Sequence, residues 1–192
     1  MSVLHNFVWT DCIHPASMLL LDSSGTLYGT VHEGGTYDAG AVFKLQTDNA
    51  GFTLLHTFQV SDGRKPTDGF VRDPTGTLYG TTREGSAGYG NVFRINPDGT
   101  GFAELHRFTG GDDGSYPQSL LILGADGYLY GTAGGGTNYY CCGTTTVFKL
   151  GTDGGNFTVL HRFKSDGSEG LVPEGALLQD ARGNLYGTAF RE

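Results

Sequence analysis

One nine-residue segment recurs four times along the chain and restricts the possible folds more than any other feature. The first copy, Asp22 to Thr30, reads DSSGTLYGT, and the others begin at residues 73, 124 and 180. Each copy predicts a tight turn followed by a short strand that is buried on both faces. Four copies predict that one structural unit is repeated along the chain.

Three further landmarks keep the same spacing. The motif LHxF begins at residues 4, 55, 105 and 160, a proline lies at 15, 66, 117 and 173, and VFKL or VFRI begins at 42, 92 and 147. Steps between equivalent residues are 50 or 51, and the last is 55 or 56. Repeats of about 40 to 50 residues with four strands each are typical of β-propeller blades.

The sequence therefore predicts an all-β propeller with four-stranded blades of about 51 residues, four to the chain. Strand B is the LYGT segment, strand C is VFKL, and strand D is FTLLHTF or its equivalent. Alternation along strand D is expected to place Leu54, His56 and Phe58 on one side and Leu55 and Thr57 on the other. The apolar runs expected to form strand A are Met18–Leu21, Gly69–Val71, Leu120–Leu123 and Ala176–Leu178. The expected single domain, 1–192, divides into blades at 17–58, 68–108, 119–163, and 175–190 together with 3–8.

The last of these blades is composite and has no strand C. Two arrangements stay open: a closed four-bladed monomer, or a half-ring that dimerises about a two-fold axis to give eight blades. Exposed blade faces and the missing strand favour association, so we expect a homodimer. The chain begins inside a repeat, and the sequence leaves open whether it is a piece of a longer polypeptide.

Composition supports the fold class and excludes some partners. Glycine accounts for 33 of the 192 residues, well above the usual level of about 7%, and the glycines fall between short apolar runs, as in turns. The net charge of −8 argues against non-specific binding to nucleic acid or anionic membrane. No apolar run is long enough for membrane insertion, and the chain as given carries no export signal.

Two polar residue types recur with the repeat, and both have a structural interpretation. The aspartates of the DxxG turns are expected to bond their own backbone, with calcium binding as the minority alternative. The histidine of LHxF recurs beside phenylalanine, so it is expected to be a packed residue rather than a catalyst. The histidines concerned are His5, His56, His106 and His161.

The motifs GTLYGTT at 76–82, GNLYGTA at 183–189, VFKL and LHRF resemble the choice-of-anchor tandem repeat family called GloVer. The resemblance covers residues 4 to 188. It implies a β-propeller-like fold in bacterial proteins that are often secreted or displayed on the surface. It brings no catalytic residues, and the sequence leaves the localisation open.

Strand alternation places the B–C and D–A loops at one end of the propeller, where several residues depart from the repeat. We expect a non-enzymatic module that binds a protein or polymer partner through these loops, and a carbohydrate-binding module is the alternative, because exposed aromatic rings suit sugar stacking. A purely structural assembly module is a further possibility. The candidate ligand-binding residues are Trp9, Tyr37, Tyr89, Tyr116, Tyr139 and Tyr140.

A metal-dependent enzyme is the second alternative, since the same loops hold ligand types suited to zinc. The residues concerned are Cys12, His14, His32 and Asp38. Their spacing matches no known motif, and the chain has no HExxH, CxxC or GxSxG sequence. We therefore predict no cofactor and no catalytic residue. Cys141 and Cys142 are adjacent, and either a vicinal disulfide or two free thiols is compatible with the sequence.

Overall fold

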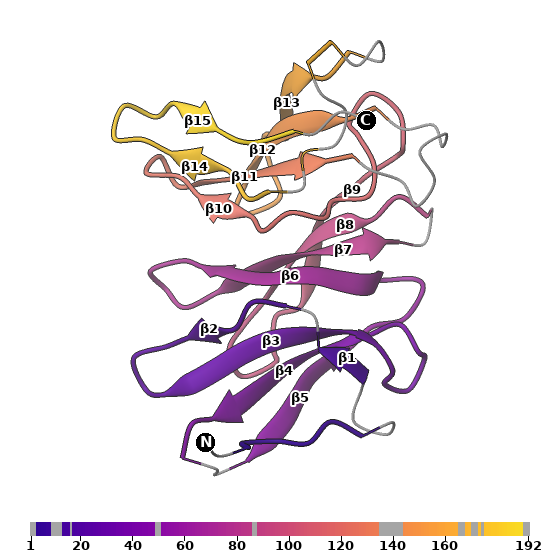
Figure 1. Ribbon diagram of the computed structural model, residues 1–192, viewed down its shortest axis with the longest axis vertical. Helices are drawn as coiled ribbons and strands as arrows, with labels where there is room; N and C mark the ends of the chain where they lie inside the picture. The colour runs from indigo at the N-terminus through magenta and orange to yellow at the C-terminus, as the bar shows by residue number, and fades with distance from the viewer. Residues whose placement is uncertain are drawn as a thin grey trace.

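A stack of antiparallel β-sheets makes up the protein (Figure 1). The computed structural model describes residues 3–8, 13–15, 17–48, 51–85, 88–134, 144–164, 168–169, 173 and 175–189. Over these residues the regular elements are all β-strands. No helix suited to crossing a bilayer is found in this part of the chain. The predicted all-β class is therefore confirmed.

The first two sheets follow each other in sequence and in space (Figure 1). Sheet 1 contains β1 (Ile13–Pro15), β2 (Leu20–Leu21), β3 (Thr26–Glu33), β4 (Ala41–Gln46) and β5 (Phe52–Thr57). Sheet 2 contains β6 (Arg64–Arg72), β7 (Leu78–Glu84), β8 (Asn91–Ile95) and β9 (Ala103–Arg107). Within sheet 2 the strand order equals the sequence order, and every neighbouring pair is antiparallel.

The remaining two sheets continue the stack towards the C-terminus (Figure 1). Sheet 3 contains β10 (Ile122–Leu123), β11 (Tyr128–Ala133), β12 (Thr146–Gly151) and β13 (Thr158–Arg162). Sheet 4 contains β14 (Leu178–Gln179) and β15 (Leu185–Tyr186). LYGT segments lie in β3, β7, β11 and β15, so they occupy the second strand of successive sheets.

Strand A begins earlier than the apolar runs suggested in sheets 1 and 2, whereas in sheets 3 and 4 it is shorter and begins later, at Ile122 and Leu178. The strand β6 starts at Arg64, two residues before Pro66, and Pro66 pairs with Thr82 in the ladder. In sheet 1 the corresponding strand is divided into β1, which ends at Pro15, and β2. Proline is tolerated because strand A is an edge strand, where the missing N–H removes no ladder hydrogen bond.

The DxxG turns are closed by their aspartates. Asp22 accepts hydrogen bonds from the backbone N–H groups of Ser24 and Thr26, both at 2.9 Å, and from the Tyr28 hydroxyl at 3.2 Å. Asp73 and Asp180 accept the hydroxyl of the tyrosine six residues later, at 2.9 and 3.1 Å. This network gives the repeated aspartates a structural role, as the sequence predicts.

The Asp22 carboxylate is expected to contribute to stability in a pH-dependent way. Burial on its own raises the pKa of this group, but the hydrogen bonds from Ser24, Thr26 and Tyr28 outweigh it and lower the pKa to about 2. The stabilisation by the Asp22 carboxylate is therefore complete above pH about 4, near the pKa of aspartate in the unfolded chain, and it is lost as the pH falls towards 2. Asp22→Asn should lower the free energy of unfolding by about 1 kcal/mol at pH 7 and by less at pH 2.

Urea unfolding at both pH values measures this effect. Asp112→Asn is the matched control, since the Asp112 side chain is 91% exposed. A loss of stability in Asp22→Asn that is equally large at pH 2 and at pH 7 would contradict the role assigned to the carboxylate.

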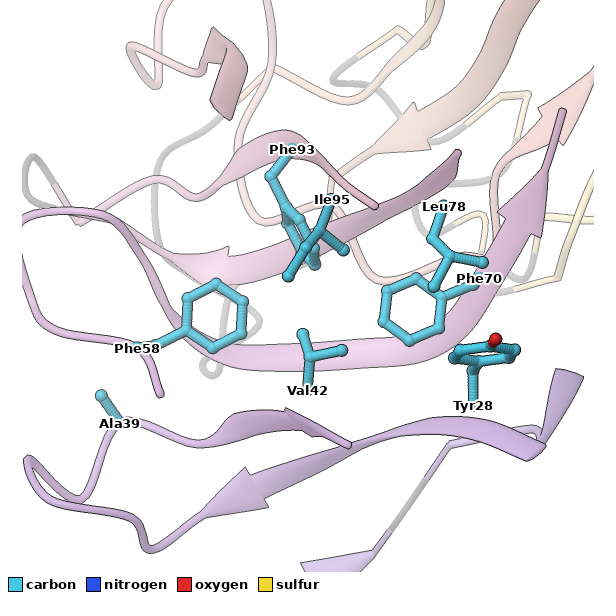
Figure 2. Packing of buried hydrophobic residues seen from close by; sticks show 8 residues of the cluster. All are labelled: Tyr28, Ala39, Val42, Phe58, Phe70, Leu78, Phe93 and Ile95. Atoms are coloured by element: carbon cyan, nitrogen blue, oxygen red, sulfur yellow. The ribbon is translucent and has the colours of Figure 1, made fainter. Parts of the chain in front are cut away.

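One apolar core lies between sheets 1 and 2 (Figure 2). Val42 and Phe58 of sheet 1 point towards Phe93 and Ile95 of sheet 2, and all four side chains are fully buried. A second cluster of the same kind lies between sheets 2 and 3 and is centred on Phe108 and Phe148. Neighbouring sheets are therefore held together by apolar burial between their faces.

The glycine of each LYGT segment makes room for the phenylalanine of strand C. Gly80 pairs with Phe93 across β7 and β8, and a Cβ atom at Gly80 would lie 2.9 Å from the Phe93 ring. The equivalent distances at Gly29 and Gly131, to Phe43 and Phe148, are 2.6 and 2.7 Å. The ring therefore lies directly over the backbone of strand B, which explains why this position of the repeat is glycine.

Two of the repeated histidines, His56 and His106, connect neighbouring sheets. His56 stacks on Phe102 with ring centroids 3.9 Å apart, and His106 stacks on Phe157 at 3.7 Å. Each histidine also meets the phenylalanine two residues later edge to face. The predicted packing role is confirmed for His56 and His106, whereas His5 stacks on Phe52 of its own sheet and the His161 side chain is 48% exposed and lies 3.0 Å from Glu169. Simple alternation along strand D is not observed, because the register shifts at Leu55 and at its equivalents, where a β-bulge inserts one residue.

The two ends of the chain lie at opposite ends of the stack (Figure 1). Leu4 and Phe7 pack on the outer cluster of sheet 1, whereas β14 and β15 pair with each other as sheet 4. The composite blade of 175–190 and 3–8 thus stays a prediction, one that would bring together segments from different chains. The number of blades in a complete ring also stays a prediction.

Candidate functional site

The B–C and D–A loops lie together at one end of the sheets, on the right in Figure 1, and we call this end the loop face. Its described part comprises the B–C loops 34–40, 85 and 88–90 and the D–A loops 58–63 and 108–116. The neighbouring ends of β1, β3, β6 and β7 belong to the same face. The shorter A–B and C–D turns lie at the opposite end (Figure 1).

One position on the loop face combines a constant backbone with a variable side chain. The residues before the first three repeat prolines are His14, Lys65 and Tyr116, and their φ angles are 60°, 54° and 50°. Left-handed φ is uncommon for residues other than glycine. The N–H groups of Lys65 and Tyr116 donate to the carbonyl oxygens of Ala39 and Tyr89, at 2.9 and 2.8 Å. The repeat thus presents a basic or an aromatic side chain from the same backbone geometry.

Tyr89 and Tyr116, both predicted ligand-binding residues, are brought together from different loops. Their ring centroids are 5.9 Å apart and the rings are inclined by 58°. Both side chains are partly exposed. A Cβ atom at Gly110 would contact the Tyr89 ring, so this glycine leaves space for it. The pair offers an aromatic surface with two hydroxyl groups, which could stack on a flat apolar ligand or on a sugar ring.

The other described candidates are placed separately. Tyr37 is 56% exposed on the loop between β3 and β4. Asp38 has a φ of 51°, and its Oδ1 atom accepts the Gly34 N–H at 2.9 Å, so the carboxylate stabilises its own turn. His14 Nδ1 lies 2.9 Å from Glu33 Oε2, on the neighbouring strand. His32 Nδ1 is 4.0 Å from Glu33 Oε1.

The metal alternative gains no support from these placements. Asp38 is occupied by its turn, and His14 is paired with Glu33. Within the residues that the structure describes, no group of three or more His, Cys, Asp and Glu side chains is arranged to hold a metal ion. Six predicted residues lie outside the described residues: Trp9, Cys12, Tyr139, Tyr140, Cys141 and Cys142. The vicinal disulfide therefore stays a prediction.

The loop face also contains a charged cluster that the sequence analysis did not identify. In sheet 2, Lys65 Nζ lies 2.7 Å from Glu84 Oε1, and Arg64 Nε lies 3.5 Å from Glu84 Oε2. Burial raises the pKa of Glu84, but the bond from Lys65 and the charges of Lys65, Arg64 and Arg83 lower it below its ordinary value. Aligning the repeats could have revealed the pattern, because Glu33 and Glu84 are equivalent residues, as are His14 and Lys65.

His32 belongs to the same cluster from the side of sheet 1. Burial is the main cause that lowers the pKa of His32, and the charges of Lys65 and Arg83 lower it further, while Glu33 and Glu84 oppose them. The strands β3 and β6 pack against each other, which brings the two sets of charges together. Cations of sheet 2 therefore act across the boundary between the sheets.

Antiparallel sheets that repeat the same strand order and stack in sequence order define a β-propeller-like repeat protein. The chain belongs to the Gloeobacter/Verrucomicrobia repeat family, which it matches over residues 1–192. This membership confirms the resemblance inferred from the LYGT, VFKL and LHRF motifs. No curated protein sequence matches the chain.

Solved structures share the fold at low sequence identity. A chain of a nidogen–laminin complex is 16% identical with a TM-score of 0.60, and the match covers 85% of this chain and 52% of that one. A protein of unknown function from Dyadobacter fermentans is 12% identical with a TM-score of 0.60, covering 90% and 60%. A candidate gluconolactonase is 18% identical with a TM-score of 0.50, covering 89% and 54%.

These similarities concern the fold alone, because all three identities are low. The present chain spans about half to three fifths of the length of these structures. The activities named for the other proteins therefore belong to those proteins.

Proposed function

We propose that this protein is a non-enzymatic recognition module that binds a polymer or protein partner through its loop face. The observation that carries the proposal is the pre-proline position, where His14, Lys65 and Tyr116 share one left-handed backbone geometry. A scaffold that fixes the backbone and varies the side chain is suited to recognition, as in other repeat proteins. The Tyr89–Tyr116 pair adds an aromatic surface on the same face.

Binding to an array that carries both glycans and peptides tests the proposal. We expect Lys65→Ala and Tyr116→Ala each to reduce the array signal by about tenfold, the usual effect of truncating a central interface residue. Ser23→Ala, which changes an exposed residue of an A–B turn at the opposite end, is the matched control and should keep the signal. Thermal unfolding of each variant verifies that the fold is retained.

Two outcomes would refute this function. One is an array without signal for the wild-type protein, and the other is a signal that survives both loop-face substitutions. A signal confined to glycans would select the carbohydrate-binding alternative. Turnover of an arrayed compound that depends on added zinc would instead select the metal-dependent enzyme.

Assembly is a second candidate function, favoured by the outer faces of the stack. A groove of about 390 Å³ on sheet 1 is lined by apolar residues that include Leu4, Phe7, Leu19 and Phe43. At the other end Leu178 is 68% exposed. Between the inner sheets, such apolar faces are covered by the next sheet. We therefore propose that a second copy of the chain covers the outer faces and completes a ring. A dimeric molar mass in light scattering supports this assembly, and a monomer at all concentrations contradicts it.

A further inference from the structure

Three cations gather at the boundary of sheets 1 and 2 on the loop face. Arg64 and Lys65 open β6, and Arg83 lies near the end of β7. The ladder pairs Arg64 with Glu84 and Pro66 with Thr82, so Lys65 and Arg83 stand opposite each other on adjacent strands. Like charges in directly opposed positions destabilise a sheet. Such a pairing is unexpected in a chain whose net charge is −8.

The nearby carboxylates do not satisfy all three cations. Glu84 is shared by Lys65 and Arg64, at 2.7 and 3.5 Å. Glu33 is paired with His14 at 2.9 Å. In the part of the chain that the structure describes, Arg83 has no carboxylate within ion-pair distance.

The Arg83 guanidinium also has an unsatisfied donor. Its Nε atom is buried and, in the described part of the molecule, has no hydrogen-bond partner. A buried donor without a partner costs roughly 1–3 kcal/mol, and more when the group is charged. Native proteins leave few such groups, and a ligand or ion is one explanation for them. The cluster is nevertheless accessible, because the Arg64 side chain is 37% exposed and that of Lys65 is 26% exposed.

The charge balance indicates what kind of ligand fits. The three cations are opposed by Glu33 and Glu84, which leaves one positive charge when the histidines are neutral. A carboxylate carries one negative charge, whereas a phosphate monoester carries about 1.5 to 2. A guanidinium also matches the two oxygens of a carboxylate with two parallel hydrogen bonds. Both arguments favour a carboxylate.

We propose that Arg83, with Lys65 and Arg64, binds the carboxylate of an acidic saccharide, such as a uronic acid unit of a polysaccharide. A saccharide is favoured over an acidic peptide because Tyr89 and Tyr116 offer an aromatic surface at the equivalent position of the next sheet. The inference rests on the proposed recognition function and specifies its ligand. The site then lies on the loop face between the first two sheets.

Calorimetric titration of the whole protein with trigalacturonic acid tests the inference. Binding is expected, and Arg83→Gln should weaken it by about tenfold or more, since hydrogen bonds to charged groups contribute about 1.5–3 kcal/mol. Arg94→Gln, an exposed arginine on β8 of the same sheet, is the matched control and should bind as the wild type does. Arg83→Gln should fold normally, because it removes an unsatisfied charge.

Control ligands test whether the protein recognises the carboxylate, the sugar or both. The neutral trisaccharide of galactose, which lacks the carboxylates, should not bind detectably. Binding should also weaken in about 0.5 M salt, because the attraction is electrostatic and partly exposed. Absence of trigalacturonate binding, equal binding by Arg83→Gln, or preference for triglutamate over trigalacturonate would each overturn the inference.

The design distinguishes this inference from the function on which it rests. If Tyr116→Ala abolishes the array signal but Arg83→Gln leaves saccharide binding unchanged, the recognition function stands and the carboxylate site is wrong. If neither substitution affects any ligand, both are wrong.

Discussion

Replacing Gly90 with alanine is expected to lower the free energy of unfolding by about 2–5 kcal/mol. Gly90 has a φ of +84°, where an L-residue loses roughly 1–2 kcal/mol. A Cβ atom would also lie 2.6 Å from Pro117 Cδ and closer still to the Thr82 carbonyl oxygen. These are backbone and ring atoms that cannot rotate away, so the clash adds about 1–3 kcal/mol.

Gly88→Ala is the matched control for this substitution. Gly88 has a φ of +89° in the same loop, but its Cβ would meet nothing within 4 Å. It should therefore show the conformational cost alone, about 1–2 kcal/mol. The difference between the two variants in chemical denaturation measures the close approach of Gly90 to Pro117, which joins sheet 2 to sheet 3. Equal losses in both variants would show that this approach contributes nothing.

Phe93→Ala is expected to destabilise the protein by about 3–5 kcal/mol, the usual range for truncating a buried phenylalanine. The Phe93 ring is fully buried and lies at the centre of the cluster between sheets 1 and 2 (Figure 2). It meets Phe58 with centroids 5.2 Å apart and Phe102 at 5.6 Å, and it covers Gly80. The substitution removes these contacts and leaves a cavity.

Two comparisons make the Phe93 measurement specific. Phe93→Leu keeps most of the buried volume and should cost less than half as much, about 1.5 kcal/mol. Tyr37→Ala removes an exposed ring and should change stability by no more than about 0.5 kcal/mol. A loss below about 1.5 kcal/mol in Phe93→Ala would show that the sheets are held together by other contacts.

Regular features of the repeat were predictable because they depend on local sequence. The Asp22 turn, the strand that contains Tyr28, and the packed position of His56 all follow from residues that recur at fixed spacing. Because the repeat occurs four times, each copy supports the same interpretation of the pattern. The family resemblance depends on these same motifs, and the match over residues 1–192 confirmed it.

Predictions failed where pairing with the neighbouring strand overrides the local sequence pattern. Strand β6 extends back through Pro66 to Arg64 because its partner β7 continues as far as Glu84. Alternation along strand D is interrupted at Leu55, because a β-bulge leaves this residue without a partner in the β4–β5 ladder. Neither feature has a signal in the residues of the strand itself.

For the candidate site, the sequence predicted loops that the structure brings to one face and two tyrosines that lie together there, and their role in binding stays a prediction. Tyr89 and Tyr116 depart from the repeat and are visible by comparison of its copies, although 27 positions separate them in the sequence. The isolated charge of Arg83 could not be recognised, because it depends on Glu84 being taken by Lys65 and Arg64. The partner of each charged side chain depends on distances between residues of two strands and two sheets.

The sequence by itself determined the repeat, the β-class and the turns, since glycine, Asx and alternating apolar residues act over a few neighbouring positions. Only the tertiary structure decided which residues share a surface. His14, Lys65 and Tyr116 share one left-handed geometry, and at Lys65 and Tyr116 it accompanies a backbone hydrogen bond to the loop of the preceding strand pair. Among the described residues, Arg83 has no carboxylate within ion-pair distance for a similar reason: the sheets fix the side-chain positions, and Glu84 is taken by Lys65 and Arg64.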